Sequence, residues 1–73
     1  MMYPRLKDMR SDAKLTQKEV AAKLNMSQTG YSKYETGEND IPTSILIQLA
    51  HLHHTSVDYL LGLTDVREPY PRK

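Results

Sequence analysis

The 73-residue sequence contains no cysteine. A chain without cysteine forms no disulfides and lacks the common zinc-finger ligand sets, and this composition fits a reducing cytoplasm. His51, His53 and His54 remain as candidate metal ligands, and residues three apart on a helix share a face. However, no carboxylate or cysteine with ligand spacing accompanies them on the same helix. We therefore expect neither a metal site nor any other cofactor.

Long hydrophobic runs are also absent. No apolar stretch approaches the length that spans a bilayer, and the first residues lack the apolar core of a secretion signal. These absences predict a soluble, cytoplasmic protein without a membrane partner. With 73 residues, 38% of them hydrophobic, the chain can fill one compact core but not two.

A strong charge of either sign is missing as well. The formal net charge is +1, far from the basic balance that indicates nucleic-acid binding by itself. Residues 1–66 carry seven Lys or Arg against eight Asp or Glu, whereas residues 67–73 carry three against one. Any affinity for nucleic acid must therefore come from a local cluster of residues.

Start and stop signals divide the chain into five short helices joined by brief loops, with no strand. Thr16 followed three residues later by Glu19 forms a capping-box pattern, and Ser27 is a good N-cap for the next helix. The expected helices cover about residues 4–13, 17–24, 28–35, 43–54 and 57–61. This order predicts an all-α, compact five-helix bundle that forms one domain over residues 1–66.

The remaining residues, 67–73, contain two prolines and no apolar period. This composition predicts an extended or disordered basic tail. Its charges need no role beyond solvation.

The most informative stretch covers about residues 17–36, where two short helices flank a turn. Two such helices cross steeply and need a small residue where the second packs on the first, and Ala21 supplies it. The inner faces and the turn carry apolar residues, namely Val20, Leu24, Met26, Tyr31 and Tyr34. The pattern is typical of a helix-turn-helix.

Five elements stand in order along the chain: R-L-K-x-x-R from Arg5, L-T-Q-K-E-V-A from Leu15, S-Q-T-G-Y-S-K-Y-E-T-G from Ser27, Pro42, and V-D-Y-L-L-G from Val57. In these elements and their spacing the sequence resembles the phage repressor and Cro-type (XRE) helix-turn-helix family over about residues 5–64. The resemblance implies a lambda-repressor-like fold whose third helix enters the major groove of double-stranded DNA. It further implies a homodimer that reads a palindromic operator as a transcriptional regulator, in the first place a repressor.

The resemblance also assigns roles to single residues. Gln17 is expected to bind a phosphate, whereas Gln28 and Thr29, in the first turn of the third helix, are expected to meet base edges, because glutamine pairs with adenine and a threonine methyl touches thymine. Lys33 lies one turn further and would reach either a guanine or a phosphate. Asn39 is the obvious donor of the following loop. The whole expected DNA-binding set is Gln17, Ser27, Gln28, Thr29, Ser32, Lys33 and Asn39.

Arg10 and Glu35 match an interior ion pair of that family. The pair would join the first helix to the end of the third. Its expected role is therefore structural, because removing one partner leaves a poorly solvated charge.

Several positions depart from the family pattern. Asn25 replaces the usual glycine of the turn, a mild change because asparagine accepts positive φ. Gly30 lies inside the third helix, so that either the backbone approaches DNA closely there or the helix is frayed. Glu38 and Asp40 put negative charge in a loop that usually faces phosphate, which predicts modest non-specific affinity. His53 replaces a large apolar or aromatic residue, and we expect it to be packed with a nitrogen that reaches water.

The fourth expected helix is apolar over more than one face. The residues expected in its core contact are Leu46, Leu49 and Ala50. Ile45 and Leu52 lie two turns apart on one side, with Leu49 at their margin, and this stripe would serve as the interface of a homodimer. In the alternative, the tail folds back and Tyr70 covers these side chains.

Catalysis is not expected. No Ser/His/Asp, Cys/His or paired-carboxylate arrangement falls on a plausible cleft, and so small a bundle has little room for a substrate pocket. We therefore expect neither an enzyme nor a small-molecule substrate. Two function classes remain: a DNA-binding regulator, and a protein-interaction module, such as an antitoxin-like partner, on the same scaffold. The intact run from Gln28 to Lys33 favours the first.

Overall fold

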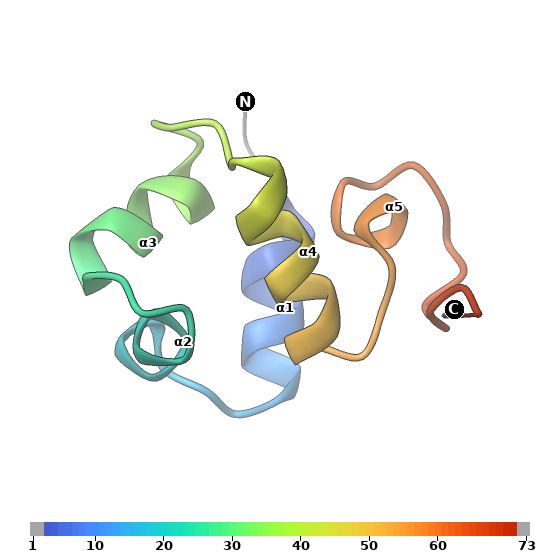
Figure 1. Cartoon of the computed structure of the whole chain (residues 1–73), viewed down its shortest axis with the longest axis horizontal. Helices are drawn as coiled ribbons and strands as arrows, with labels where there is room; N and C mark the ends of the chain where they lie inside the picture. Colours follow the sequence, from blue (N-terminus) through green and yellow to red (C-terminus); the bar gives the residue numbers. More distant parts are fainter. Residues whose placement is uncertain (1–2, 72–73) are drawn as a thin grey trace.

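The computed structural model describes residues 3–71 and contains five α-helices, with no strand in that part of the chain (Figure 1). They are α1 (Pro4–Asp12), α2 (Gln17–Lys23), α3 (Gln28–Thr36), α4 (Thr43–Leu52) and α5 (Val57–Leu60). The all-α fold class is confirmed, with the helices in the expected order. None of these helices has the length and apolar character needed to cross a bilayer. Arg72 and Lys73 of the expected tail lie outside the described residues.

Side-chain caps begin three of the helices, as the sequence indicates. At α2, the backbone N–H of Glu19 donates to Thr16 Oγ1 at 3.1 Å, and the backbone N–H of Thr16 donates to Glu19 Oε1 at 2.9 Å. The hydroxyls of Ser27 and Ser56 each accept a backbone N–H from the first turn of α3 and α5. These bonds satisfy donors that the first turn of a helix otherwise leaves without partners.

Four helices end earlier than the sequence predicts: α1, α2 and α5 by one residue, and α4 by two. α4 ends at Leu52 rather than near residue 54, because His53 leaves the helical region and His54 adopts a left-handed φ of 55°. α5 ends at Leu60, one residue before the expected end. The turn after α4 has neither the glycine nor the asparagine that usually marks a left-handed C-cap, so the sequence carries no ordinary signal for it.

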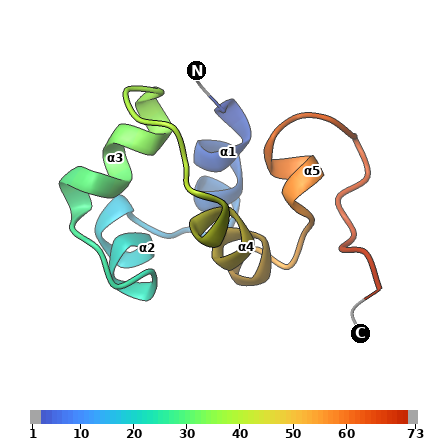
Figure 2. The same cartoon turned by 45° about the horizontal axis from the view of Figure 1, so that its top comes forward.

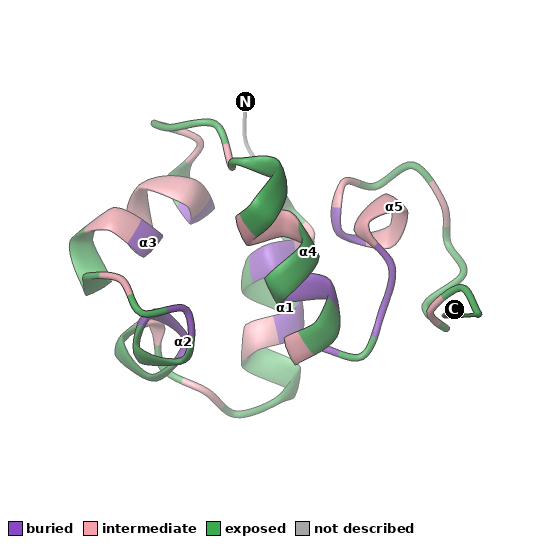
Figure 3. Ribbon diagram, in the orientation of Figure 1, coloured by how far each residue is buried: buried purple, intermediate pink, exposed green. Residues whose placement is uncertain are grey.

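Every helix contributes at least one buried apolar residue to the core. Buried residues of all kinds are purple in Figure 3. The buried residues are Leu6, Met9, Val20, Ala21, Leu24, Tyr31, Leu49, Ala50 and Leu60. Leu6 and Met9 on α1, and Val20 with Leu24 at the end of α2, recur at helical spacing, so these helices turn one apolar face inward. The solvent-facing sides of α2 and α3 are thereby left to polar residues.

α4 packs differently from the expectation at several positions. Leu49 and Ala50 are buried, as expected, but Leu46 is only half buried. Ile45 and Leu52, expected on the surface, are half buried and pack against the core. Leu49 has no exposed area at all, so it belongs to the core and not to a surface stripe.

The chain beyond α5 runs back along the outer side of that helix, away from α2 and α3 (Figure 2). Thr55 Oγ1 donates to the carbonyl of Arg67 at 2.5 Å, and the hydroxyl of Tyr70 donates to Asp58 Oδ2 at 2.9 Å. The described part of the tail has no regular secondary structure, and these two hydrogen bonds attach it to the domain. Tyr70 remains 62% exposed, and it lines one pocket together with Ile47 and Ala50 of α4.

His53 follows α4 as a buried side chain that is only 8% exposed. Its Nε2 atom is buried and makes no hydrogen bond within residues 3–71, so this nitrogen is not the one expected to reach water. Burial lowers the pKa of His53, and the nearby positive charge of Arg67 lowers it further, while Glu35 acts in the opposite direction.

The buried imidazole should make stability depend on pH. Because the pKa of His53 in the folded state lies below its ordinary value of 6.5, the unfolded chain binds the proton first as the pH falls. The melting temperature should therefore drop between pH 7 and pH 5, and His53→Leu should reduce this drop. His54→Asn is the matched control, because His54 is exposed and asparagine tolerates its positive φ. Melting curves in which both variants and the parent show equal pH dependence would contradict the role of His53.

Candidate nucleic-acid interface

α2 and α3 form a helix-turn-helix in which Asn25 makes the turn. Asn25 has a left-handed φ of 57°, the conformation that glycine usually supplies at this place. The Met26 N–H donates to the Ala21 carbonyl at 3.0 Å and closes the turn. Ala21 itself is 1% exposed, so the small residue expected at the helix contact is buried there. The replacement of glycine by asparagine leaves the motif intact.

The outer face of α3 presents polar side chains to solvent. Its inner face buries Tyr31 and Glu35, whereas Gln28 and Thr29 are exposed. A shallow groove of about 380 Å³ runs along this outer face. The residues that line the groove are Gln17, Gln28, Thr29, Ser32, Lys33, Thr36 and Glu38. The structure therefore gathers five of the seven residues expected at DNA into one surface.

Ser27 and Asn39 complete the expected set but do not line the groove. The Ser27 hydroxyl accepts the N–H of Gly30 at 3.1 Å, which makes it the N-cap of α3. The backbone N–H of Asn39 donates to the Lys33 carbonyl at 3.1 Å, so the backbone donor of Asn39 is already used within the protein. Both side chains are exposed and lie beyond the two ends of α3.

Gly30 has a packing reason that the sequence did not show. A Cβ atom at this position would lie 3.1 Å from Ser27 Oγ and 3.2 Å from Met26 Cε, tighter than ordinary van der Waals contact. The helix runs without interruption from Gln28 to Thr36, so it is not frayed at the glycine. The N-cap and the turn residue pack where a larger side chain would project.

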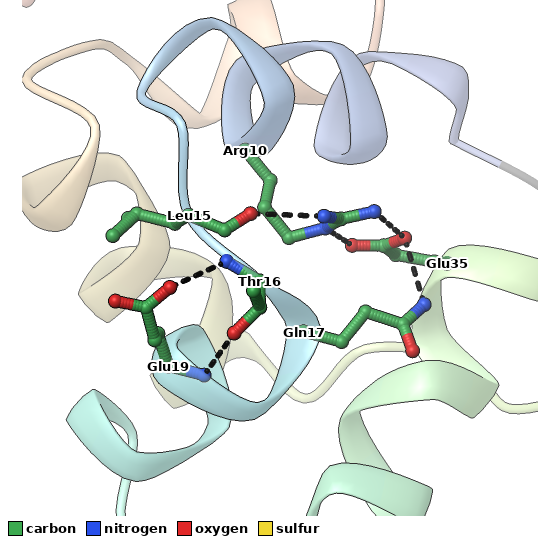
Figure 4. Close-up of polar contacts among 6 residues, drawn as sticks. All are labelled: Arg10, Leu15, Thr16, Gln17, Glu19 and Glu35. Carbon is green, nitrogen blue, oxygen red and sulfur yellow. Dashed lines mark hydrogen bonds and ion pairs between the residues drawn. The ribbon is translucent and has the colours of Figure 1, made fainter.

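Beneath the groove, Arg10 and Glu35 form a bidentate ion pair (Figure 4). Arg10 Nε lies 2.7 Å from Glu35 Oε2, and Arg10 Nη2 lies 3.2 Å from Oε1. Arg10 Nη1 also donates to the carbonyl of Leu15 at 3.0 Å. The pair thus joins α1, the loop before α2 and the end of α3. The side chains are 15% and 5% exposed, so both charges are largely removed from water.

Gln17 belongs to the same cluster. Its Nε2 donates to Glu35 Oε1 at 3.1 Å, as Figure 4 shows. The expected phosphate-binding side chain is therefore oriented by the buried carboxylate. This contact could not be inferred from spacing, because it links residues 18 positions apart on two helices.

The protonation states of the cluster follow from these bonds. Burial alone would raise the pKa of Glu35, but hydrogen bonds from Arg10 and Gln17 hold it below its ordinary value. The hydrogen bond to Glu35 raises the pKa of Arg10. Burial, together with the adjacent Glu35 carboxylate, raises the pKa of Tyr31 well above its usual range. The pair is consequently ionised at neutral pH.

The described residues do not gather a set of metal ligands. Within residues 3–71, no group of three or more His, Cys, Asp or Glu side chains is close enough together to hold a metal ion. The groove on α3 is open and polar, unlike the enclosed, mostly apolar pockets that bind small molecules.

Thr36 is a groove residue that sequence reasoning missed, whereas Glu38 was expected in a loop that faces phosphate but was not placed in the groove itself. Thr36 follows Ser32 by four positions and Thr29 by seven, so helical periodicity alone places it on the same face. Glu38 lies beyond the helix, and its position depends on how the chain turns after Gly37. No periodicity predicts that placement.

A family model described as Helix-turn-helix matches residues 6–60, which run from α1 to the end of α5. The chain belongs to this helix-turn-helix family. The match covers more than half of the chain and confirms the resemblance to phage repressor and Cro-type domains.

Two relatives from Bacillus subtilis show how far the similarity extends. The uncharacterized HTH-type transcriptional regulator YobD is 39% identical over 69 residues, which cover 94% of this chain and 62% of the relative. The HTH-type transcriptional regulator ImmR is 45% identical over 62 residues, which cover 85% of this chain and 49% of the relative. The chain thus spans about half to three fifths of the length of the curated relatives it matches.

Proposed function

We propose that the chain binds double-stranded DNA sequence-specifically and acts as a transcriptional regulator, with α3 inserted in the major groove. This proposal rests on the two faces of α3. The inner face packs Tyr31 and Glu35 into the domain, and the outer face presents a row of polar side chains to solvent. Membership of the helix-turn-helix family supports it, as do the relatives named as transcriptional regulators. A major groove admits one α-helix and exposes a distinct donor and acceptor pattern for each base pair.

The groove residues divide into base-reading and positioning roles. Gln28 reads adenine through a bidentate pair of hydrogen bonds, and the Thr29 methyl contacts thymine. Lys33, one turn further along the groove, reaches guanine acceptors or a phosphate. Gln17 has one amide N–H left after its bond to Glu35, and this donor binds a phosphate that fixes the register.

The proposal extends to a homodimer on a palindromic operator. One recognition helix reads only a few base pairs, whereas two copies about one DNA turn apart read enough sequence to select a site. Ile45 and Leu52 retain exposed area on one side of α4 and are the residues proposed for the contact between copies. Occupation of such an operator excludes other proteins from it, so repression is the proposed outcome.

Selection of bound duplexes from a random pool tests this function. The expected result is a consensus with two-fold symmetry, two chains per duplex at saturation, and an affinity that falls steeply with salt because phosphate contacts release counterions. A consensus without symmetry, bound by one chain, would contradict the dimer alone. No consensus and no salt dependence would contradict DNA binding and favour a protein-interaction module.

Gln28→Ala should reduce discrimination between duplexes more than total affinity. A bidentate pair between a side chain and a base contributes about 1 to 3 kcal/mol of discrimination, whereas phosphate contacts are independent of sequence. The measurement is the ratio of dissociation constants for the selected duplex and for single-base variants of it. Ser11→Ala is the control, because Ser11 is an exposed polar residue on α1, outside both the groove and the proposed contact between copies. If Gln28→Ala ranked all variants as the parent does, Gln28 would not read a base.

A further inference from the structure

The groove on α3 contains a carboxylate, although DNA is a polyanion. Among the residues that line it, Lys33 is the only cation and Glu38 is the only anion, so the lining has no formal net charge. Lys33 Nζ lies 3.9 Å from Glu38 Oε2, and the two side chains are 45% and 64% exposed. A surface built only for tight binding to phosphate would not place an anion beside its one lysine.

The backbone after α3 holds Glu38 in this place. Gly37 has a left-handed φ of 81°, which L side chains rarely adopt, and it reverses the chain at the end of the helix. The N–H of Asn39 then donates to the carbonyl of Lys33 at 3.1 Å. Glu38 lies between these two fixed points, beside the turn of helix that carries Lys33. The fold thus places the backbone of Glu38 where its carboxylate can reach the ammonium of Lys33.

We propose that Glu38 is a specificity-determining residue, which weakens contacts between Lys33 and phosphate while permitting contacts between Lys33 and a base edge. The proposal rests on the proposed function and names how the same groove rejects incorrect sequences. A phosphate that approaches the lysine ammonium carries a full negative charge and is repelled by the adjacent carboxylate. The guanine acceptors O6 and N7 carry no net charge, so the same carboxylate repels them far less.

Weaker phosphate contact has a larger effect on incorrect duplexes than on correct ones. Binding to an arbitrary sequence depends almost wholly on phosphates, whereas binding to the correct sequence also uses base edges. A repulsive element in the groove therefore increases the ratio of the two affinities while lowering both. Glu38 thus lowers the affinity for every duplex but increases the preference for the correct sequence.

Glu38→Gln, compared with Glu68→Gln, tests this role on the selected duplex and on an arbitrary duplex of equal length. Both changes remove one negative charge, but Glu68 is exposed and belongs to the segment beyond α5. That segment lies on the opposite side of the domain from α3 (Figure 1). For Glu38→Gln we expect roughly twofold to fivefold tighter binding to the arbitrary duplex at 0.1 M salt, the range that exposed charge pairs support. The slope of log affinity against log salt should steepen by about 0.9, the value for one additional phosphate contact. The selected duplex should gain less, so the ratio should fall. Glu68→Gln should leave the ratio unchanged.

The same change in a variant without Lys33 tests whether Glu38 acts through Lys33 or through its charge on the whole DNA surface. In Lys33→Gln, the additional change Glu38→Gln should alter binding to the arbitrary duplex by a smaller factor than in the parent. Equal ratios for the parent and Glu38→Gln, or equal effects of the two glutamine variants, would overturn the proposal. Loss of binding to the selected duplex alone would also overturn it, because Glu38 would then contact a base itself. A parent that prefers no duplex would contradict the proposed function, and this inference with it.

Discussion

Glu35→Ala should lower the free energy of unfolding by about 3 to 5 kcal/mol, because it leaves the guanidinium of Arg10 buried without its partner. The change also removes the acceptor of Gln17 Nε2. For a domain of this size, such a loss corresponds to a fall in melting temperature of more than about 10 °C. Thermal unfolding followed by circular dichroism measures it.

Two comparisons isolate the ion pair from other effects of the substitution. Glu68→Ala, on the exposed segment beyond α5, should change the melting temperature little. The double change Arg10→Met with Glu35→Leu should lose less than Glu35→Ala, since replacing both charges by apolar groups leaves no charge uncompensated. If Glu35→Ala kept the parent melting temperature yet abolished DNA binding, Glu35 would act at the interface and not in the fold.

The carboxylate of Glu35 also makes the stability of the fold depend on pH in the acid range. The pKa of Glu35 in the folded state lies below its ordinary value of 4.5, so the unfolded chain takes up the proton first as the pH falls. The stabilisation is therefore complete above about pH 4.5 and is lost as the pH falls through the lowered value. His53 acts at higher pH, so the two groups weaken the fold in separate windows.

Local chemistry explains which parts of the fold could be predicted from the sequence. Thr16, Ser27 and Ser56 begin helices through bonds that span three residues, so a short window of sequence contains all the information needed. The apolar faces of α2 and α3 follow from a period of 3.6 residues. Asn25 could be placed in the turn because asparagine tolerates positive φ.

Contacts between distant residues explain what could not be predicted. The bond between Gln17 and Glu35 depends on the crossing of two helices, and the tail is held by Thr55 through a carbonyl twelve positions further on. No local pattern encodes either contact. On α4, the sequence shows more apolar residues than one face can hold, but it does not show which of them face the core. Ile45 was therefore expected on the surface, whereas it packs against the core.

Arg5 makes a set of contacts between distant parts of the chain that the sequence did not indicate. Its Nη1 donates to the carbonyl of Tyr59 at 3.0 Å and also to the carbonyl of Thr64, and its Nη2 lies 2.8 Å from Asp65 Oδ1. The guanidinium carbon lies 4.2 Å from the centre of the Tyr59 ring. One side chain of α1 therefore holds both α5 and the segment that follows it. α5 has only four residues and is far too short to be stable without such contacts.

Arg5→Met should accordingly lower the free energy of unfolding by about 3 kcal/mol, since each hydrogen bond from a charged donor contributes about 1.5 to 3 kcal/mol and the carbonyls lose that donor. Lys7→Met, an exposed change on the same helix, should cost little. Asp65→Asn should also cost little, because the Asp65 side chain is fully exposed and solvent screens an ion pair at such a position. Arg5→Lys should rescue only part of the loss, because an ammonium cannot bridge two carbonyls with a planar fork.

Amide hydrogen exchange should locate the effect, with the amides of Leu60 and Leu61 exchanging faster and those of α3 exchanging at rates set by global stability alone. If Asp65→Asn cost as much as Arg5→Met, the ion pair rather than the carbonyl contacts would hold α5 to α1.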